Sequence, residues 1–215
     1  MGESLTERIT KRQQRAAATA EQLLAAAREV FESKGYQATT VGAITQAANT
    51  AHGTFYLYFK NKEDAFAKVM AQVVSEMFQE AGAPWTDDPR ETLSRATRGF
   101  FAVFQAHKGL WRCLLEGMHQ SEAIEKMWLE LRRPFIERIA RNLDRSVASG
   151  MARPMNTEVA AHALAAMTEW TAFAHFELGA PGPGRVSADE LADTVTDLWY
   201  HAVYAGAYDA PKQPA

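Results

Sequence analysis

The side chains best suited to specific chemistry stand close together between residues 52 and 59. Phe55 and Phe59 are four residues apart, so in a helix they would lie on one side and pack inward. The flanks of the same helix would carry an imidazole, a hydroxyl and phenol rings, from His52, Thr54, Tyr56 and Tyr58. Such groups donate and accept hydrogen bonds, and they match the polar base edges of the major groove of DNA.

A preceding helix and a tight turn would hold these side chains in place. Val41, Ile44 and Ala48 recur at helical intervals and predict a helix over about residues 40–48 with one buried face. Asn49 follows, and Asn tolerates the positive φ that such a turn needs. Two short helices joined in this way predict a helix-turn-helix, in which the second helix enters the major groove.

The caps of the neighbouring helices follow from single residues. Ala51 has no side-chain oxygen to accept the free N–H groups of the second helix, so we expect Thr50 to cap that helix one residue earlier. Asn61 is predicted to cap the next helix, which continues to about residue 80, and Asp64 resembles the acid of a capping box.

Residues 39–66 resemble the TetR family of transcriptional regulators. The motifs that carry the resemblance are Thr40-Val41, Ala47-Ala48, Gly53-Thr54-Phe55-Tyr56 and Tyr58-Phe59-Lys60-Asn61-Lys62-Glu63. A looser similarity to the ligand-binding half of the EthR-like branch covers residues 100–108, 127–128 and 198–204. The family commonly has Gly where this chain has Asn49, and Ser or Thr where it has Ala51, which affects the geometry of the turn.

We expect two kinds of contact with DNA. The resemblance implies that phosphates are clamped by Thr40, at a helix N-terminus that favours anions, and by Tyr56 and Lys62. Base edges would be read from the second helix, where a glycine permits close approach. The predicted DNA-binding set is Thr40, His52, Gly53, Thr54, Tyr56, Tyr58 and Lys62.

Alternative interpretations of these residues stay open. The two tyrosines could be core residues, although their hydroxyls would then need buried partners. Lys60 and Lys62 could belong to a solvated loop. A basic N-terminal arm either touches the minor groove or is disordered, and it consists of Arg8, Lys11, Arg12 and Arg15.

Composition is that of a folded globular chain without a membrane span. Of the 215 residues, 47% are hydrophobic and 23% are charged, and no apolar run reaches about 18 residues. The N-terminus lacks the apolar stretch of a signal peptide, and the single cysteine, Cys113, suits a reducing compartment, so we expect a cytoplasmic protein. The net charge of −3 combines a basic segment 1–62, at +3, with an acidic remainder. This asymmetry favours an N-terminus that faces DNA.

The chain is predicted to be all-α, with about nine helices and no strand, because no segment alternates with a period of two. A helix over about 11–34 should end at Gly35, and Pro134 falls inside a long helix over 122–149. We expect a helix-turn-helix DNA-binding domain at 1–66, a ligand-binding and dimerisation domain at 67–208, and a flexible tail at 209–215.

Large apolar side chains gather in the second half of the chain. They are either plain core or the wall of a cavity for a lipophilic small molecule, in which Thr168 would be a polar contact. The resemblance implies a long apolar tunnel here. It matches five residues to pocket positions: Trp128, Phe135, Thr168, Phe173 and Trp199. The predicted ligand-binding set is Phe101, Phe104, Trp111, Met118, Trp128, Phe135, Ile139, Met167, Thr168, Phe173 and Trp199.

The last two predicted helices, 157–178 and 188–205, are apolar on more than one side. One face would meet the core and the other a second copy of the chain, in a two-fold four-helix interface. A dimer also spaces two recognition helices for a palindromic operator.

These observations together predict a ligand-responsive repressor that binds double-stranded operator DNA as a homodimer and is released by a lipophilic effector, without cofactor or metal. Two alternatives remain: a helical architectural DNA-binding protein without ligand response, and a small helical enzyme. The enzyme is disfavoured because the six histidines show no metal-ligand spacing and the chain lacks nucleophile and phosphate-loop motifs.

Overall fold

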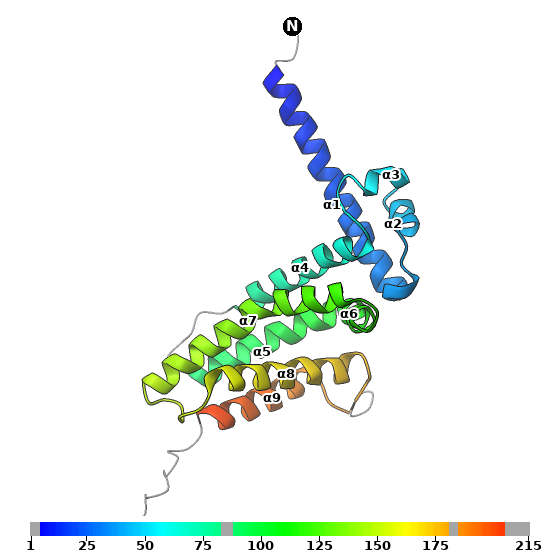
Figure 1. The fold of residues 1–215 in the computed structure, drawn as a ribbon. Coiled ribbons are helices and arrows are strands. Elements are labelled where there is room, and N and C mark those ends of the chain that lie inside the picture. Colours follow the sequence, from blue (N-terminus) through cyan, green and yellow to red (C-terminus); the bar gives the residue numbers. More distant parts are fainter. Residues whose placement is uncertain (1–4, 83–87, 181–184, 205–215) are drawn as a thin grey trace, which may run out of the picture. The chain divides into compact units, whose positions relative to one another are not determined.

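The computed structural model describes residues 5–82, 88–180 and 185–204, and these ranges contain α-helices and no strand (Figure 1). The prediction of an all-α chain is confirmed. The predicted tail at 209–215 lies outside the described residues. The helices are α1 (Leu5–Ala38), α2 (Val41–Ala47), α3 (His52–Phe55), α4 (Lys62–Glu80), α5 (Pro89–Ala106), α6 (Lys108–Gln120), α7 (Glu122–Ala148), α8 (Thr157–Phe176) and α9 (Ala188–Val203).

Helix ends follow the local chemistry. Gly35, with φ of 80°, interrupts α1 at the predicted position. The side chain of Asn61 accepts a hydrogen bond from the N–H of Asp64 at 2.8 Å, so the predicted cap of α4 is confirmed. Asn156 caps α8 in the same way, and Ser187 caps α9. Among the described residues, no helix has both the length and the apolar character needed to cross a bilayer.

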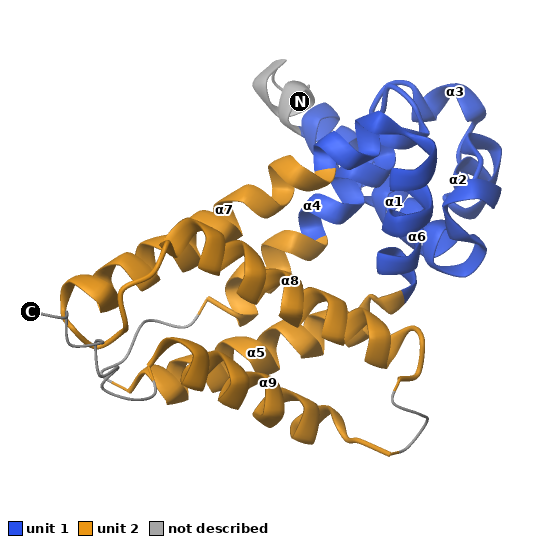
Figure 2. Cartoon of the chain, turned by 60° about the horizontal axis from the view of Figure 1, so that its bottom comes forward, with its two compact units in different colours: residues 1–72, 109–127 blue, residues 73–108, 128–215 orange. Residues whose placement is uncertain are grey.

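The chain divides into two compact units that are not continuous in sequence (Figure 2). Unit 1 consists of residues 1–72 and 109–127, and unit 2 of residues 73–108 and 128–215. Helices α4 and α7 therefore each contribute residues to both units. The functional division at residue 66 that the sequence suggests stays a prediction, because compactness alone does not say which residues bind DNA or ligand.

The core of unit 1 is built around aromatic rings. Phe31 of α1 and Phe66 of α4 are fully buried, with ring centroids 4.9 Å apart in an edge-on arrangement. Tyr36 packs against both, at 6.0 Å from Phe31 and 5.3 Å from Phe66. Such pairs add to the free energy gained from burying the rings. They fix the start of α4 against the end of α1.

Helix α6 belongs to this core although it is distant in sequence. A Cβ atom at Gly109 would lie 3.1 Å from the backbone oxygen of Glu32, so α6 approaches α1 closely. The carboxylate of Glu116 accepts the backbone N–H of Tyr36 at 2.9 Å, and the thiol of Cys113 donates to the carbonyl of Phe31 at 3.0 Å. Three contacts along one helix thus bind α6 to the end of α1.

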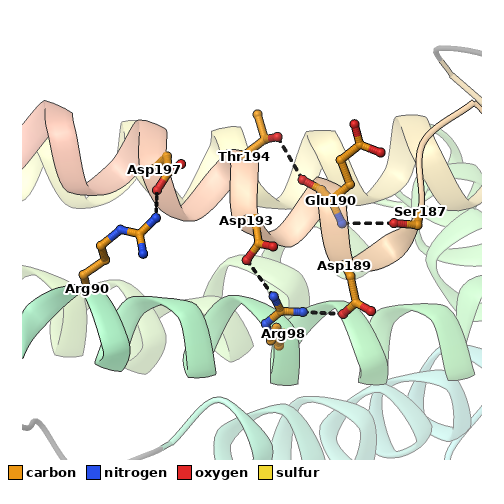
Figure 3. Close-up of polar contacts among 8 residues, drawn as sticks. All are labelled: Arg90, Arg98, Ser187, Asp189, Glu190, Asp193, Thr194 and Asp197. Atoms are coloured by element: carbon orange, nitrogen blue, oxygen red, sulfur yellow. Dashed lines mark hydrogen bonds and ion pairs between the residues drawn. The ribbon is translucent and has the colours of Figure 1, made fainter.

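Helices α5 and α9 pack side by side in unit 2 and are linked by ion pairs across their exposed edge (Figure 3). Arg90 pairs with Asp197, and Arg98 pairs with both Asp189 and Asp193, the latter at 2.6 Å. Because the partners are largely exposed, each pair adds little to stability. Their regular spacing along α9 sets the register of the two helices.

The apolar core of unit 2 lies among α7, α8 and α9. It contains Ile136 and Leu143 of α7, Leu164 and Ala165 of α8, and Val203 of α9. Ile136 and Leu143 are seven residues apart, which is about two turns, so both lie on one face of α7. On their other faces, α8 and α9 carry exposed apolar side chains such as Trp170 and Leu198.

We expect Gly99→Ala to lower the free energy of unfolding by about 1–3 kcal/mol, the usual cost of overpacking. A Cβ at Gly99 would lie 2.6 Å from the backbone oxygen of Glu80 and 3.1 Å from the backbone nitrogen of Ala81, so the backbone must move. Gly42→Ala is the matched control, since its Cβ would meet only the Thr40 hydroxyl at 3.9 Å. Urea unfolding of the full chain measures both, and equal stabilities would contradict the close packing of α5 on the end of α4.

Candidate functional site

The first candidate site is the helix-turn-helix formed by α2 and α3 in unit 1. Thr40 caps α2, and its exposed hydroxyl oxygen accepts the N–H of Ala43 at 3.1 Å. The turn passes through Asn49, whose φ of 49° confirms the predicted left-handed conformation. The side chain of Gln22 in α1 donates to the carbonyl of Ala48 at 2.8 Å. These bonds hold the end of α2 and the turn against α1.

Helix α3 has one buried side and one exposed side. Phe55 is fully buried and Phe59 is 4% exposed, with ring centroids 5.0 Å apart. Tyr56, the next residue after Phe55, is 54% exposed. Its ring lies 5.6 Å from the ring of His52, which is also exposed. Phe55 is the last residue of α3, and Phe59 lies four residues further on, after the turn that follows the helix. The two phenylalanines are buried together, as predicted, and anchor α3 and this turn while aromatic groups stay on the surface.

Four of the seven predicted DNA-binding residues are exposed in the structure. Thr40, His52, Gly53 and Tyr56 are exposed, whereas Thr54 and Tyr58 are half-buried. Lys62 is placed differently from the expectation. Its ammonium donates to the carbonyl of Tyr36 at 2.9 Å and lies 4.4 Å from the centre of that ring. A phosphate contact by Lys62 would have to use its remaining N–H groups.

The start of α3 differs from the sequence-based expectation. The helix begins at His52 with Ala51 as its N-cap, and no side chain caps it. Thr50 precedes the cap, and its buried hydroxyl has no hydrogen-bond partner in the described part of the chain. The prediction that Thr50 caps this helix is therefore wrong. The backbone at Ala51 is extended, with φ of −70° and ψ of 146°, which places the cap one residue later.

Sequence reasoning did not select Leu57, which is 78% exposed beside Tyr56. It lies midway between the buried Phe55 and Phe59, so the same helical spacing that identifies the anchors also places Leu57 on the opposite side. An exposed leucine on this surface can make apolar contacts with a thymine methyl group or a sugar. It is a further candidate member of the DNA-binding surface.

The second candidate site is a cavity of about 80 Å³ inside unit 2. Four of the eleven predicted ligand-binding residues line it: Phe135, Ile139, Thr168 and Trp199. Lining residues that sequence reasoning did not select include Phe100 of α5, and Arg138 and Asn142 of α7. Most of the wall is apolar, and polar side chains stand at separate points along it.

The other seven predicted residues do not line this cavity, and their role as ligand contacts stays a prediction. Phe101 and Phe104 are buried and pack against Phe176 at 5.9 and 6.0 Å. Phe173 stacks on the exposed Trp170 at 5.4 Å. Trp111 and Met118 belong to α6 in unit 1. Trp128 of α7 and Met167 of α8 are half-buried.

Thr168, the predicted polar contact for a ligand, makes hydrogen bonds within unit 2. Its hydroxyl donates to the carbonyl of Leu164 at 3.1 Å and accepts the indole N–H of Trp199, also at 3.1 Å. The group therefore links α8 to α9 in the cavity wall. A ligand could use only its remaining lone pair.

A half-buried ion pair includes Glu169, another residue of the wall. Arg132 of α7 donates from Nε to both carboxylate oxygens of Glu169 in α8, at 2.7 and 3.0 Å. Burial raises the pKa of Glu169, and the hydrogen bond and charge of Arg132 partly offset that rise. This pair joins α7 to α8 and neutralises the carboxylate that Glu169 contributes to the wall.

Family models match both halves of the chain. The model described as bacterial regulatory proteins, tetR family, matches residues 23–69, which include α2 and α3. The model described as the C-terminal domain of the transcriptional regulator EthR matches residues 93–205, which include every lining residue of the cavity from Leu93 onward. The two matches thus coincide with the two candidate sites.

Individual proteins that are similar to this chain are also regulators. An HTH-type transcriptional regulator of Bacillus subtilis, YhgD, is 26% identical over 147 residues, which cover 65% of this chain and 74% of that protein. The fatty acid metabolism regulator protein of B. subtilis is 43% identical over 60 residues, 26% of this chain and 31% of that protein. The crystal structure of the regulator FadR from B. subtilis in complex with stearoyl-CoA has a TM-score of 0.67 at 22% identity and covers 83% of this chain and 96% of its own.

We expect Ala51→Ser to raise the free energy of unfolding by about 0.5–2 kcal/mol, because serine would supply the missing cap of α3. Ala47→Ser is the control, since it places the same side chain at an exposed position inside α2 and should change stability by no more than about 0.5 kcal/mol. Thermal unfolding monitored by circular dichroism distinguishes the two. A stability of Ala51→Ser at or below that of the natural chain would contradict the assigned start of α3.

Proposed function

This chain belongs to the TetR family of bacterial regulatory proteins and has an EthR-like C-terminal domain, and from this premise we propose that it is a dimeric repressor released from its operator by a lipophilic small molecule. It is a DNA-binding transcriptional regulator and not an enzyme. The observation that supports the proposal most strongly is the surface of α3, where Tyr56 and His52 are exposed beside buried anchors. We place its action in the cytoplasm, where the operator is.

At the operator, α3 enters the major groove and α2 lies across the backbone. The Thr40 hydroxyl already accepts the N–H of Ala43, so its own proton is available to a phosphate oxygen. Tyr56 is exposed enough to donate to a second phosphate. His52 and Thr54 read base edges. A Cβ at Gly53 would meet no atom of the described residues within 4 Å, so the backbone there is open to close approach by DNA.

The effector occupies the cavity of unit 2, lined by Phe100, Phe135 and Trp199 among others. Apolar walls with a few polar groups are typical of small-molecule sites. The fatty acid metabolism regulator named above and the stearoyl-CoA complex of FadR indicate that a lipid-like effector is a reasonable class for this chain. At about 80 Å³ the cavity holds only a few water molecules, so side chains must move to admit such a molecule.

Helix α4 transmits the effect of effector binding to α3, the helix that reads the operator. It begins in unit 1, where Phe66 packs on Phe31, and it ends in unit 2, where Ala81 lines the cavity. An effector that displaces the end of α4 therefore acts on a helix that is bound to the core of the helix-turn-helix unit. A coupling of about 1–3 kcal/mol between the two sites is enough for useful release.

Dimerisation uses the outer face of α8 and α9. Val159 and Trp170 of α8 are both 62% exposed, and Leu198 of α9 is 55% exposed. Ala163 and Ala166 are exposed between the first two, at spacings that form one stripe along α8. An apolar stripe of this size is rarely left in water, and small residues within it allow a second helix to approach. A two-fold dimer through these helices presents two α3 helices to a palindrome.

For DNA binding, we expect Tyr56→Ala to weaken operator affinity by at least about tenfold, which corresponds to about 1–3 kcal/mol for a specific contact. Its free energy of unfolding should stay within about 0.5 kcal/mol of the natural value, because the side chain is largely exposed. Phe55→Ala is the contrasting variant, and it should lose about 3–5 kcal/mol of stability. Fluorescence anisotropy with a duplex selected from random sequences measures the affinity, and undiminished binding by Tyr56→Ala would contradict the assignment.

For dimerisation, we expect Trp170→Glu to sediment as a monomer at micromolar concentration and to lose at least about tenfold in operator affinity, since half-sites are then bound singly. Met151→Glu is the control, because Met151 is also exposed but lies outside α8 and α9. Analytical ultracentrifugation separates the outcomes. A dimer that survives in Trp170→Glu would show that another surface forms the interface.

A further inference from the structure

One wall of the cavity in unit 2 carries a positive charge without a carboxylate partner among the described residues. Arg138 of α7 lines the cavity and is half-buried. Its Nη2 donates to the carbonyl of Ala81 at 2.7 Å, and it forms no ion pair with any described residue. Burial lowers the pKa of its guanidinium from the ordinary value, and no described acid offsets that fall. The guanidinium is therefore partly removed from water, and among the described residues its hydrogen-bond partner is the backbone carbonyl of Ala81.

The other charged group in the wall does not compensate for it. The carboxylate of Glu169 already accepts two hydrogen bonds from Arg132. Arg132 and Arg138 are six residues apart, or about 9 Å along the axis of α7. The unbalanced charge that faces the cavity is therefore the positive charge of Arg138.

Several uncharged polar groups of the wall already make hydrogen bonds within the chain. The Thr92 hydroxyl donates to the carbonyl of Asp88 at 3.1 Å, and the Tyr204 hydroxyl bonds to Ser146 at 3.2 Å. Thr168 is bound between α8 and α9, as described above. A guanidinium, by contrast, has five N–H donors, and the Ala81 carbonyl takes one of those of Arg138. Thr97 and Asn142 also line the wall, and the side-chain oxygen of Asn142 accepts a hydrogen bond from Arg145. Both of these side chains are uncharged, so Arg138 is the lining residue that offers a positive charge together with several N–H donors.

We propose that the effector is an amphiphile with one negatively charged head group, a carboxylate or a phosphate, which pairs with Arg138 while its apolar tail packs among Phe100, Phe135 and Trp199. This inference rests on the proposed function, which places an effector in the cavity. A neutral lipophile would leave the arginine buried without a counter-charge, whereas an anion supplies both the charge and acceptors for a two-pronged contact.

The same arginine connects the head group to α4. The Ala81 carbonyl directly follows the last residue of that helix and holds the guanidinium of Arg138. A carboxylate or phosphate is a stronger acceptor than a neutral carbonyl, so it competes for the same N–H groups. Binding of the anion therefore loosens the contact between α7 and the end of α4. A neutral ligand of the same length has no such effect.

The test compares ligands that differ only in the head group. Decanoate, 1-decanol and decylamine are titrated into the full-length chain by isothermal calorimetry, and decyl phosphate distinguishes a phosphate from a carboxylate preference. We expect decanoate or decyl phosphate to bind at least about tenfold more tightly than decanol, a factor that equals about 1.4 kcal/mol. Decylamine should bind most weakly. Equal affinities for decanoate and decanol, tighter binding of decylamine, or no binding of either anion would overturn the inference.

Variants assign the preference to Arg138. In Arg138→Gln, decanoate and decyl phosphate should no longer bind more tightly than decanol. In Arg138→Lys, which keeps the positive charge, they should still bind somewhat more tightly. The second variant allows a conclusion even if Arg138→Gln folds poorly. Arg141→Gln is the matched control, because Arg141 is exposed on the same helix and does not line this cavity. An anion preference that persists in Arg138→Gln would overturn the assignment.

Operator binding by the same preparations separates this inference from the proposed function. If the chain binds its operator and decanoate and decanol release it equally well, the charge-specific effector is wrong and the repressor stands. If the chain has no preferred DNA sequence, the proposed function itself fails.

Discussion

The burial of Phe55 and Phe59 is the constraint on which the proposed DNA-binding surface depends. Helix α3 contains four residues and has no side-chain cap, so it has little stability of its own. The two rings, 5.0 Å apart in the core of unit 1, replace that missing stability with packing. Because they face inward, Tyr56 and Leu57 face outward. The packing of the core therefore determines which side chains lie on the proposed DNA-binding surface.

In unit 1, α6 and α4 both contact the end of α1, close to the start of the helix-turn-helix. Glu116 accepts the backbone N–H of Tyr36, whose ring also packs on Phe66 at the start of α4. Helices α4 and α6 therefore meet the same short segment at the end of α1. Under the proposed mechanism, a displacement of either helix would act on the residues that precede α2.

The sequence predicted the parts of the structure that depend on local patterns. Helical spacing identified the anchors of α3, and single residues identified the break at Gly35, the turn at Asn49 and the cap at Asn61. The cap of α3 was predicted one residue too early, because a side chain's capacity to cap does not show where the backbone becomes extended.

The cavity was less accessible to prediction, because its wall depends on which residues from separate helices meet. Helical spacing in α7 selected Phe135 and Ile139, which do line it, but the same kind of argument also selected Trp111 and Met118, which α6 carries into unit 1. Arg138 was not selected, since an arginine in a long helix is usually solvated. Arg138 is a candidate ligand contact because it is half-buried in the cavity wall and forms no ion pair with a described residue. Neither property can be predicted from the spacing of residues in the sequence.

The most direct test of the whole account is a nuclease footprint on the DNA upstream of the gene that encodes this chain and its neighbours. The account predicts protection of a palindromic segment whose half-sites are separated by about one helical turn, 34–36 Å, or a multiple of it. Protection should disappear when a lipophilic anion is added. Binding that weakens with salt but protects no particular sequence would contradict it, because a protein of that kind holds the backbone without reading bases.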